Sequence, residues 1–266
     1  MADEASVLTS LDGGLFTVTL NRPDKLNSFN EAQHAALREA LEEATQNDAI
    51  RAILVTGAGR AFCAGQDLGD RDPRTMDGPP DLSATLRDLY APTLTLIRTL
   101  EKPVICAVNG VAAGAGANIA LACDIVLAAR SAKFIQAFAK LGLVPDAGGS
   151  WSLARLIGEA RAKAVAMTAM PVPAEQAESW GMIWKAVDDD RLMEEATELG
   201  RQLADGPTFG LGKTKIAIQA AATNSFADQL ELEAQLQGEC GRAPDYAEGV
   251  LAFMEKRPAK FTGKPA

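Results

Sequence analysis

Four short stretches of the chain carry hydrophobic side chains in patterns typical of β-strands. Residues 15–20 (LFTVTL) alternate between apolar and polar positions, whereas residues 52–56 (AILVT), 104–108 (VICAV) and 125–128 (IVLA) are apolar throughout. Strands that are apolar on both faces, and that alternate with helical segments, are typical of parallel sheets in α/β proteins. The pattern therefore predicts an α/β fold.

Helical periodicity occupies most of the remaining chain. An amphipathic helix is predicted at residues 31–45 and another at residues 82–100, after a segment rich in proline, aspartate and glycine (residues 71–80) that we expect to be a surface loop able to cover a site. Beyond residue 190 the pattern is almost wholly helical, at residues 192–203, 211–222, 226–240 and 246–254. We expect a core at residues 1–200 and a helical C-terminal lobe at residues 201–266, which either caps the core or forms an oligomer surface.

Composition excludes several classes of function. No run of about 18 apolar residues occurs, and the chain starts with acidic residues instead of the basic and apolar pattern of a secretory signal, so we expect a cytoplasmic protein with no membrane contact. The net charge of −9 disfavours nucleic-acid partners. Four cysteines without a CxxC pair and a single histidine, His34, predict neither a metal site nor a histidine-based nucleophile mechanism. His34 lies in the first helical pattern, and we expect it to be a solvated helix residue.

Two glycine-containing segments follow two of the predicted strands. Residues 57–68 (GAGRAFCAGQDL) come after the strand at 52–56, and residues 109–118 (NGVAAGAGAN) come after the strand at 104–108 and lead into an apolar helix. Glycine lets a ligand approach the backbone, and the first turn of a helix offers N–H groups without internal partners. Two such turns facing each other would form an oxyanion hole. The alternative is that Gly114 and Gly116 only allow close packing of helix and strand.

Three separated motifs resemble one enzyme family. The strings AFCAGQDL (61–68), KPVICAVNGVAAGAGANIALACDIVLA (102–128) and FIQAFAKLGLVPDAGG (134–149) are similar to the crotonase (enoyl-CoA hydratase/isomerase) superfamily. That resemblance implies a spiral of ββα turns, a homotrimer or hexamer, and an acyl-CoA thioester as substrate, with coenzyme A as part of the substrate and no separate cofactor. It also places the oxyanion hole on the N–H groups of Ala64 and Ala115, as donors to enolate charge on the thioester oxygen.

The same resemblance bears on the reaction. Hydratases of the family use two glutamates, and the matching positions here are Asn118 and Phe138, so hydration is disfavoured. Asp146 stands where hydratases usually carry glycine; it is either an N-terminal cap of the helix near Gly149 or, by resemblance to isomerase members, the catalytic acid or base. Phe138, Leu143 and Trp151 are expected to desolvate it and raise its pKa.

Among family members, the strings LNRPDKLNSFN, FCAGQDL and LGLVPD are most similar to the isomerases that convert ring-1,2-epoxyphenylacetyl-CoA to oxepin-CoA. The alternatives are a straight-chain 3,2-enoyl-CoA isomerase, a hydratase-like enzyme, and a non-catalytic scaffold. The expected substrate contacts lie around the two turns and in the early NRPDK string, and they are Lys25, Gly65, Gln66, Asp67, Leu68, Gly114, Asn118 and Phe138. Of these, Gln66 and Asp67 either fix their loop or touch the pantetheine and adenine parts of CoA.

Overall fold

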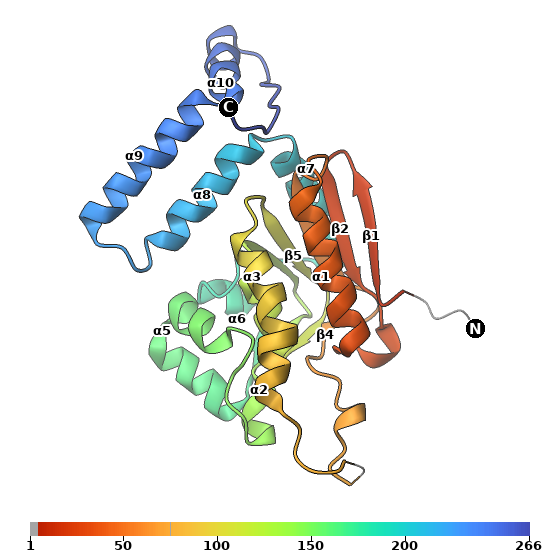
Figure 1. Cartoon of the computed structure of the whole chain (residues 1–266). Helices are drawn as coiled ribbons and strands as arrows, with labels where there is room; N and C mark the ends of the chain where they lie inside the picture. Colours follow the sequence, from red (N-terminus) through yellow and green to blue (C-terminus); the bar gives the residue numbers. More distant parts are fainter. Residues whose placement is uncertain (1–4, 75) are drawn as a thin grey trace.

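The computed structural model describes residues 5–74 and 76–266. The acidic start of the chain (residues 1–4) and Thr75, within the predicted loop at residues 71–80, lie outside the described residues. Strands and helices alternate as the sequence predicts, and the chain folds into two sheets flanked by helices, with three C-terminal helices standing away from the sheets (Figure 1).

The larger sheet contains the four strands predicted from the sequence and two more. Its order is β1-β2-β3-β5-β7-β10, in which β1 and β2 pair antiparallel and all the other neighbours pair parallel. The bounds are Val7–Asp12 (β1), Leu15–Leu20 (β2), Ala52–Gly57 (β3), Val104–Val108 (β5), Ile125–Ala129 (β7) and Lys185–Val187 (β10). Every residue of β3 and β5 is buried, as expected for strands that are apolar on both faces.

The smaller sheet has the order β4-β6-β8-β9, with bounds Ala61–Cys63 (β4), Val111–Ala113 (β6), Lys133–Ile135 (β8) and Pro171–Pro173 (β9). Strands β4, β6 and β8 run parallel to one another and β9 runs antiparallel to β8. Three successive segments of the chain therefore give one strand to the larger sheet, one to the smaller sheet and then a helix. This arrangement is the spiral of ββα turns that the sequence resemblance predicts.

The helices match the predicted pattern except at residues 82–100. Their bounds are Glu31–Gln46 (α1), Leu82–Thr85 (α2), Ala91–Thr99 (α3), Ala115–Ala122 (α4), Gly149–Thr168 (α5), Ala174–Ser179 (α6), Leu192–Ala204 (α7), Thr208–Ala220 (α8), Phe226–Arg242 (α9) and Pro244–Glu255 (α10). Four short 3-10 turns complete them, at Pro23–Lys25 (η1), Gly69–Arg71 (η2), Ala137–Leu141 (η4) and Asp189–Arg191 (η5). None of the described helices is long and apolar enough to cross a membrane.

The predicted helix at residues 82–100 is interrupted by a π-helical turn, η3 (Leu86–Tyr90). Pro92 stands in the first turn of α3, directly after it. Proline has no N–H group and its ring crowds the preceding turn, so a continuous α-helical ladder cannot pass through this position. Periodicity alone does not reveal this break, because a π turn shifts the helix by one residue without changing which residues are apolar.

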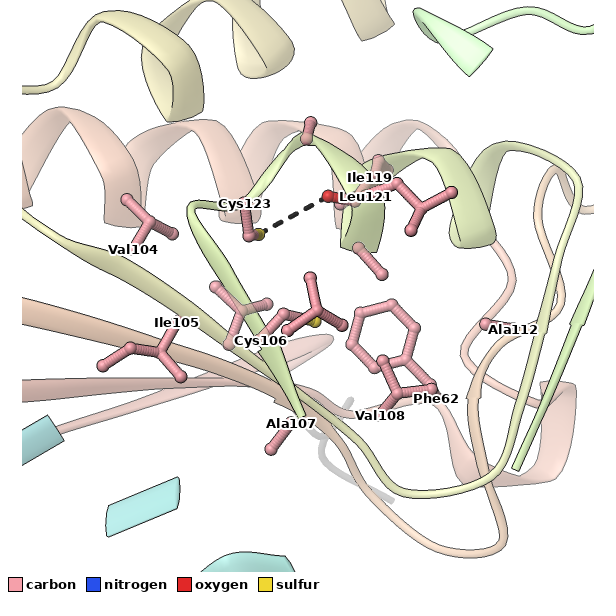
Figure 2. Close-up of a cluster of buried hydrophobic side chains, with 14 of the residues drawn as sticks. Phe62, Val104, Ile105, Cys106, Ala107, Val108, Ala112, Ile119, Leu121 and Cys123 are labelled. Carbon is pink, nitrogen blue, oxygen red and sulfur yellow. Dashed lines mark hydrogen bonds between the residues drawn. The ribbon is translucent and has the colours of Figure 1, made fainter. Parts of the chain in front are cut away.

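The hydrophobic core lies between the larger sheet and its neighbours. Figure 2 shows the part around β5 and α4, where the buried ring of Phe62 from the smaller sheet lies beside Val108 and Ile119. The thiol of Cys123 donates to the carbonyl oxygen of Ile119 at 3.5 Å. Cys63, Cys106 and Cys123 are buried free thiols, and Cys240 is partly exposed.

The predicted boundary between core and lobe, residues 200/201, falls inside α7. Helix α7 packs against β2, β3, β5 and β7, so it belongs to the core, and the helical lobe begins with α8. Periodicity showed a helix at this position but not which surface it covers, and that surface decides the boundary.

Candidate active site

Three loops meet at one edge of the smaller sheet. They follow β4, β6 and β8 and contain residues 64–68, the start of α4, and residues 136–148 respectively. Because these neighbouring strands are parallel, their carboxyl ends lie at the same edge, which is where α/β proteins commonly bind ligands. The topology therefore brings together three motifs that are far apart in the sequence.

The first two loops are in direct contact at Gly65. A Cβ atom on Gly65 would lie 2.8 Å from the carbonyl oxygen of Ala113 and 3.4 Å from the amide nitrogen of Ala115. Gly65 also has a φ of +92°, which side chains disfavour. Only glycine lets the two turns approach this closely, and the predicted convergence of the two glycine turns is therefore present.

The amide of Ala115 is available to a ligand. Ala115 is the first residue of α4 and follows Gly114, whose φ of 53° and ψ of −128° are readily adopted only by glycine. Its N–H group has no acceptor among the described residues, as expected in the first turn of a helix. Gly116, by contrast, serves close packing, because a Cβ there would lie 2.5 Å from the carbonyl oxygen of Cys63.

The amide of Ala64 is not available, and this part of the predicted oxyanion hole is wrong. Its N–H group donates to the carbonyl oxygen of Leu26 at 2.9 Å. Leu26 lies in the NRPDKLNSF segment, where it and Asn27 both adopt left-handed backbone conformations. The sequence could not show that this distant segment lies alongside the loop and uses the Ala64 donor.

The structure offers the amide of Gln66 instead. Gln66 forms an isolated parallel bridge with Phe29, in which the Phe29 amide donates to Gly65 and the Asp67 amide donates to Phe29, at 2.7 and 2.8 Å. Backbone groups alternate in direction along an extended chain, so the Gln66 N–H points away from Phe29. Within residues 5–74 and 76–266 it has no acceptor. The sequence predicts that Gln66 fixes its loop or touches CoA, and it does not single out the Gln66 backbone N–H as a donor.

Asp146 in the third loop presents a carboxyl group that no described residue satisfies. Its main-chain carbonyl oxygen accepts from the amide of Gly149 at 2.7 Å and from Nδ2 of Asn118 at 2.8 Å. Its Oδ1 atom is buried and has no hydrogen-bond partner among the described residues. The N-terminal cap of α5 is Gly148, with no side-chain hydrogen bond, so the alternative role of Asp146 as a helix cap is wrong.

Burial raises the pKa of Asp146 to about 6, and the positive charge of Arg71 opposes this shift. A carboxyl group loses stabilising water contacts when it is buried, which favours its neutral form. Arg71 comes from η2, at the start of the predicted covering loop, and its guanidinium group donates to the Thr85 hydroxyl at 3.1 Å. The carboxyl group can therefore take up and release a proton near neutral pH.

The side-chain amide of Asn118 connects Asp146 to Gln136. Its Nδ2 donates to the Asp146 carbonyl oxygen, and its Oδ1 accepts from Nε2 of Gln136, both at 2.8 Å. A Cβ on Gly149 would lie 2.2 Å from the Asn118 amide nitrogen, so Gly149 is needed to admit this side chain. Asn118 thus holds the Asp146 loop against α4, and its contact with the substrate stays a prediction.

The aromatic residues predicted around Asp146 lie in different places. Phe138 is buried in η4, and a Cβ on Gly114 would lie 3.7 Å from the tip of its ring, so Phe138 lines the turn before Ala115. The Trp151 ring contacts the guanidinium groups of Arg98 and Arg155, which lie 4.8 and 4.0 Å from its centroid. A role for Trp151 and Leu143 in burying the Asp146 carboxyl stays a prediction.

Asp67 fixes its own loop. Its Oδ1 accepts from the Gly69 amide at 3.0 Å and its Oδ2 pairs with Arg22 at 2.9 Å, and these bonds hold the pKa of Asp67 below its usual value. Lys25 is exposed nearby and adds to that effect through its charge, and Leu68 is half exposed at the loop surface. Contacts of Lys25, Asp67 and Leu68 with CoA remain predictions.

His34 is buried, contrary to the expectation that it is a solvated helix residue. It is 1% exposed, its ring contacts Phe29 and Tyr90 at centroid distances of 4.6 and 4.3 Å, and burial lowers its pKa to about 4. Sequence reasoning also missed Tyr90, which donates from its hydroxyl to the side-chain oxygen of Gln66 at 3.0 Å. The one available signal was that Tyr90, a residue with a polar tip, stands in an apolar helical pattern.

Comparison with known proteins agrees with this fold. The family model for enoyl-CoA hydratase/isomerase matches residues 11–264. The chain therefore belongs to the enoyl-CoA hydratase/isomerase family.

Among individual relatives, the chain is 54% identical to the 1,2-epoxyphenylacetyl-CoA isomerase of Escherichia coli K12, over 97% of this chain and 98% of that protein. It is 34% identical to the trans-2-decenoyl-[acyl-carrier-protein] isomerase of Streptococcus mutans, over 98% of this chain and 100% of that protein. The crystal structure of an enoyl-CoA hydratase from Polaromonas sp. JS666 superimposes with a TM-score of 0.90 at 33% identity, covering 96% of this chain and 99% of that one.

Proposed function

We propose that this chain is an isomerase of acyl-CoA thioesters that converts ring-1,2-epoxyphenylacetyl-CoA to oxepin-CoA. The observation that carries the proposal is the Asp146 carboxyl group, which is partly buried and lacks a partner for Oδ1 in the described chain. It belongs to the same sheet edge as two unused amides, those of Gln66 and Ala115. The 54% identity with an isomerase of this substrate class supports the choice of acyl group.

In this mechanism the two amides act as an oxyanion hole. The carboxylate of Asp146 removes a proton from the carbon next to the thioester, and the N–H groups of Gln66 and Ala115 hold the negative charge that develops on the thioester oxygen. The neutral Asp146 then returns the proton to a ring carbon as the epoxide-bearing ring expands to seven members. The molecular formula is unchanged, so the reaction needs one group that both accepts and donates a proton.

Hydration fits the site less well. Adding water across a double bond uses a second group to activate the water, and the matching position Asn118 is a neutral amide whose nitrogen and oxygen are already bonded to Asp146 and Gln136. The buried Phe138 occupies the other position. A single carboxyl group favours transfer of one proton within the substrate.

The proposal predicts how the rate depends on pH. Asp146 must be ionised to remove the first proton, so kcat/KM should rise with pH through about 6 and level off above that value. Steady-state kinetics from pH 4.5 to 8.5 would measure this limb. A rate independent of pH across the same range would contradict the assignment of Asp146 as the base.

The decisive experiment replaces Asp146 with asparagine, which keeps the size of the side chain and cannot exchange a proton as a carboxylate. We expect Asp146→Asn to lower kcat at least about 100-fold while the CoA ester still binds. The matched control is Asp190→Asn, at an exposed position in η5. Product analysis should show unchanged mass with altered ultraviolet absorption, whereas a gain of the mass of water would mark hydration. Unimpaired turnover in Asp146→Asn would refute the mechanism.

A straight-chain 3,2-enoyl-CoA isomerase is the second candidate. One carboxyl group beside two amide donors suits either reaction, and 34% identity to an isomerase of a decenoyl thioester favours keeping this alternative. Comparing kcat/KM for a linear 3-enoyl-CoA and for the aromatic epoxide would separate the two. A higher value for the linear substrate would replace the proposed acyl group and leave the role of Asp146 intact.

The setting of the enzyme is also part of the proposal. Coenzyme A serves as part of the substrate, with Lys25 and Asp67 near its path and no further cofactor. The apolar side chains that α8, α9 and α10 expose support assembly as a trimer or hexamer. A cytoplasmic location agrees with the acyl-CoA substrate.

A further inference from the structure

The side chain of Gln66 is anchored at both ends of its amide. Its Nε2 donates to the carbonyl oxygen of Phe29 at 2.9 Å, and its Oε1 accepts from the hydroxyl of Tyr90 at 3.0 Å. The same Phe29 carbonyl also accepts from the Asp67 amide. Gln66, whose backbone N–H has no acceptor among the described residues, is therefore held in two ways. Its side-chain amide is bonded at both ends, and the peptide that follows it is bonded to Phe29.

Tyr90 reaches Gln66 because of the π-helical turn before α3. Tyr90 is the last residue of η3, is 3% exposed, and lies two residues before Pro92. The extra residue in a π turn rotates the side chains that follow, and such turns are frequent at functional sites. Without this turn, the helical register would direct the hydroxyl group elsewhere on the helix surface.

An uncharged aromatic cluster holds the Tyr90 ring. The edge of Tyr90 packs against His34 at 4.3 Å with an interplanar angle of 85°, and its ring lies 5.9 Å from that of Phe29. His34 is neutral near pH 7, because burial lowers its pKa to about 4. Its Nε2 atom makes no hydrogen bond of normal geometry among the described residues, and the neighbouring Gln66 side chain only partly offsets the lowering of the His34 pKa, so ring packing against Phe29 and Tyr90 holds His34 in place.

We propose that Tyr90 is a positioning residue that fixes the oxyanion donor of Gln66, and that the rings of His34 and Phe29 hold Tyr90 in place by packing against it. This inference rests on the proposed function, in which the Gln66 amide binds the thioester oxygen. Oxyanion donors stabilise a transition state only when they are held in place before the charge develops. A hydroxyl group that does not touch the substrate can therefore affect the rate by orienting one that does.

The test is Tyr90→Phe, which removes one oxygen and leaves the ring packing intact. We expect kcat to fall about 10-fold with KM changed less than about threefold. The loss is smaller than the 100-fold or more that follows deletion of an oxyanion donor, because the Gln66 N–H is misdirected and not removed. Tyr246→Phe is the matched control: it alters the only other tyrosine, an exposed residue of α10, and should keep wild-type kinetics.

A spectroscopic measurement separates positioning from general damage. The infrared stretch of phenylacetyl-CoA labelled with ¹³C at the thioester carbonyl should shift to lower frequency on binding to the wild type, because the two amides polarise the bond. The shift should shrink in Tyr90→Phe and persist in Asp146→Asn, which lacks only the proposed base. Full turnover in Asp146→Asn together with a reduced shift in Tyr90→Phe would refute the mechanism and keep this inference.

Two further variants guard against misfolding of the first. Gln66→Met keeps the backbone N–H but removes both side-chain anchors, and the double variant with Tyr90→Phe should be no slower than Gln66→Met alone. His34→Phe keeps the ring packing and removes a buried unpaired nitrogen, so it should unfold at an equal or higher temperature and keep the wild-type carbonyl shift. A wild-type carbonyl shift in Tyr90→Phe, or additive losses in the double variant, would overturn the proposal.

Discussion

At the scale of single residues, Asp146 shows how the fold holds a reactive group without neutralising it. Its backbone is fixed by Gly149 and Asn118, whereas its carboxyl Oδ1 is buried without a hydrogen-bond partner among the described residues and the charge of Arg71 opposes the rise of its pKa. Burying a carboxyl group without a hydrogen-bond partner destabilises the folded state. A raised pKa is useful for proton transfer, so stability is lost here in favour of the chemistry.

The cost of burying Asp146 can be measured from the pH dependence of stability. The folded protein binds a proton at Asp146 more tightly than the unfolded chain does, so the contribution of this group to stability is lost as pH rises from about 4 to about 6. Asp146→Asn should therefore raise the free energy of unfolding at pH 7.5 by about 1 to 2 kcal/mol, a figure reduced for the partial exposure of the carboxyl group, and by much less at pH 4. Urea unfolding at both pH values measures the difference. Equal effects at the two pH values would contradict the assigned pKa.

At the scale of elements, the close approach of two turns decides whether two amides can share one oxygen. The loop after β4 and the start of α4 come together at Gly65, where a side chain would meet the backbone of the opposite turn. Asn118 ties the third loop to α4 in the same region. The site therefore depends on a few residues that join the ends of neighbouring strands.

Gly65→Ala tests the contact between the turns. The added Cβ would lie 2.8 Å from the Ala113 carbonyl oxygen, and the φ of +92° would strain any side chain, so the turns must separate. We expect kcat to fall by about 100-fold or more, the range seen when one oxyanion donor is lost. Gly241→Ala in α9, where an added Cβ meets nothing within 4 Å, is the control and should leave kinetics unchanged. Wild-type kcat in Gly65→Ala would show that the two turns need not be this close.

Asn118→Ala tests the support of the Asp146 loop. It removes one buried and one partly buried hydrogen bond and leaves the Gln136 side chain without its partner, which should lower the free energy of unfolding by about 2 to 3 kcal/mol. It should also lower kcat while Asp146 is still present, because the loop loses its attachment to α4. Chemical denaturation and steady-state kinetics measure the two effects. A loss of stability with unchanged kcat would limit Asn118 to a structural role.

At the scale of the whole molecule, the C-terminal helices combine firm attachment with an exposed apolar surface. Lys215 of α8 pairs with Asp124 of the core at 2.9 Å and donates to the carbonyl oxygen of Ile97 at 2.7 Å. Helices α8, α9 and α10 stand away from the sheets (Figure 1) and expose large apolar side chains, namely Ile218, Phe226, Phe253 and Met254. Exposed apolar side chains on neighbouring helices favour association.

Phe253→Asp tests that association. Phe253 is 86% exposed in α10, so the substitution should leave the fold of one chain intact while adding a charge to the apolar surface. We expect sedimentation velocity to show a trimer or hexamer for the wild type and smaller species for the variant, with Asp190→Asn again as control. A wild-type chain that sediments as a monomer would contradict the predicted assembly.

Much of the fold could be predicted from the sequence because hydrophobic periodicity is a local signal. The strand at residues 104–108 and the helix starting at residue 31 have the predicted bounds, or nearly so, since burial imposes a period of two or of 3.6 on the residues themselves. The two glycine turns and Asp146 could also be identified from the sequence. Glycine marks positions where the backbone adopts conformations that other residues disfavour, and Asp146 stands where hydratases of the family usually carry glycine.

What only the tertiary structure decided concerns contacts between segments distant in sequence. The amide of Ala64 is used by Leu26, so the free donor of that loop is Gln66, and His34 lies inside a cluster with Tyr90 instead of in solvent. Asn118 of α4 likewise donates to the carbonyl oxygen of Asp146, which lies in a different loop. Hydrogen bonds and burial depend on which surfaces meet, and a period along one segment carries no information about its partner. The sequence by itself determined the helices, the strands and the reactive residue types. The packing of the ββα turns determined which of their amide and carboxyl groups are left without a partner and can bind a ligand.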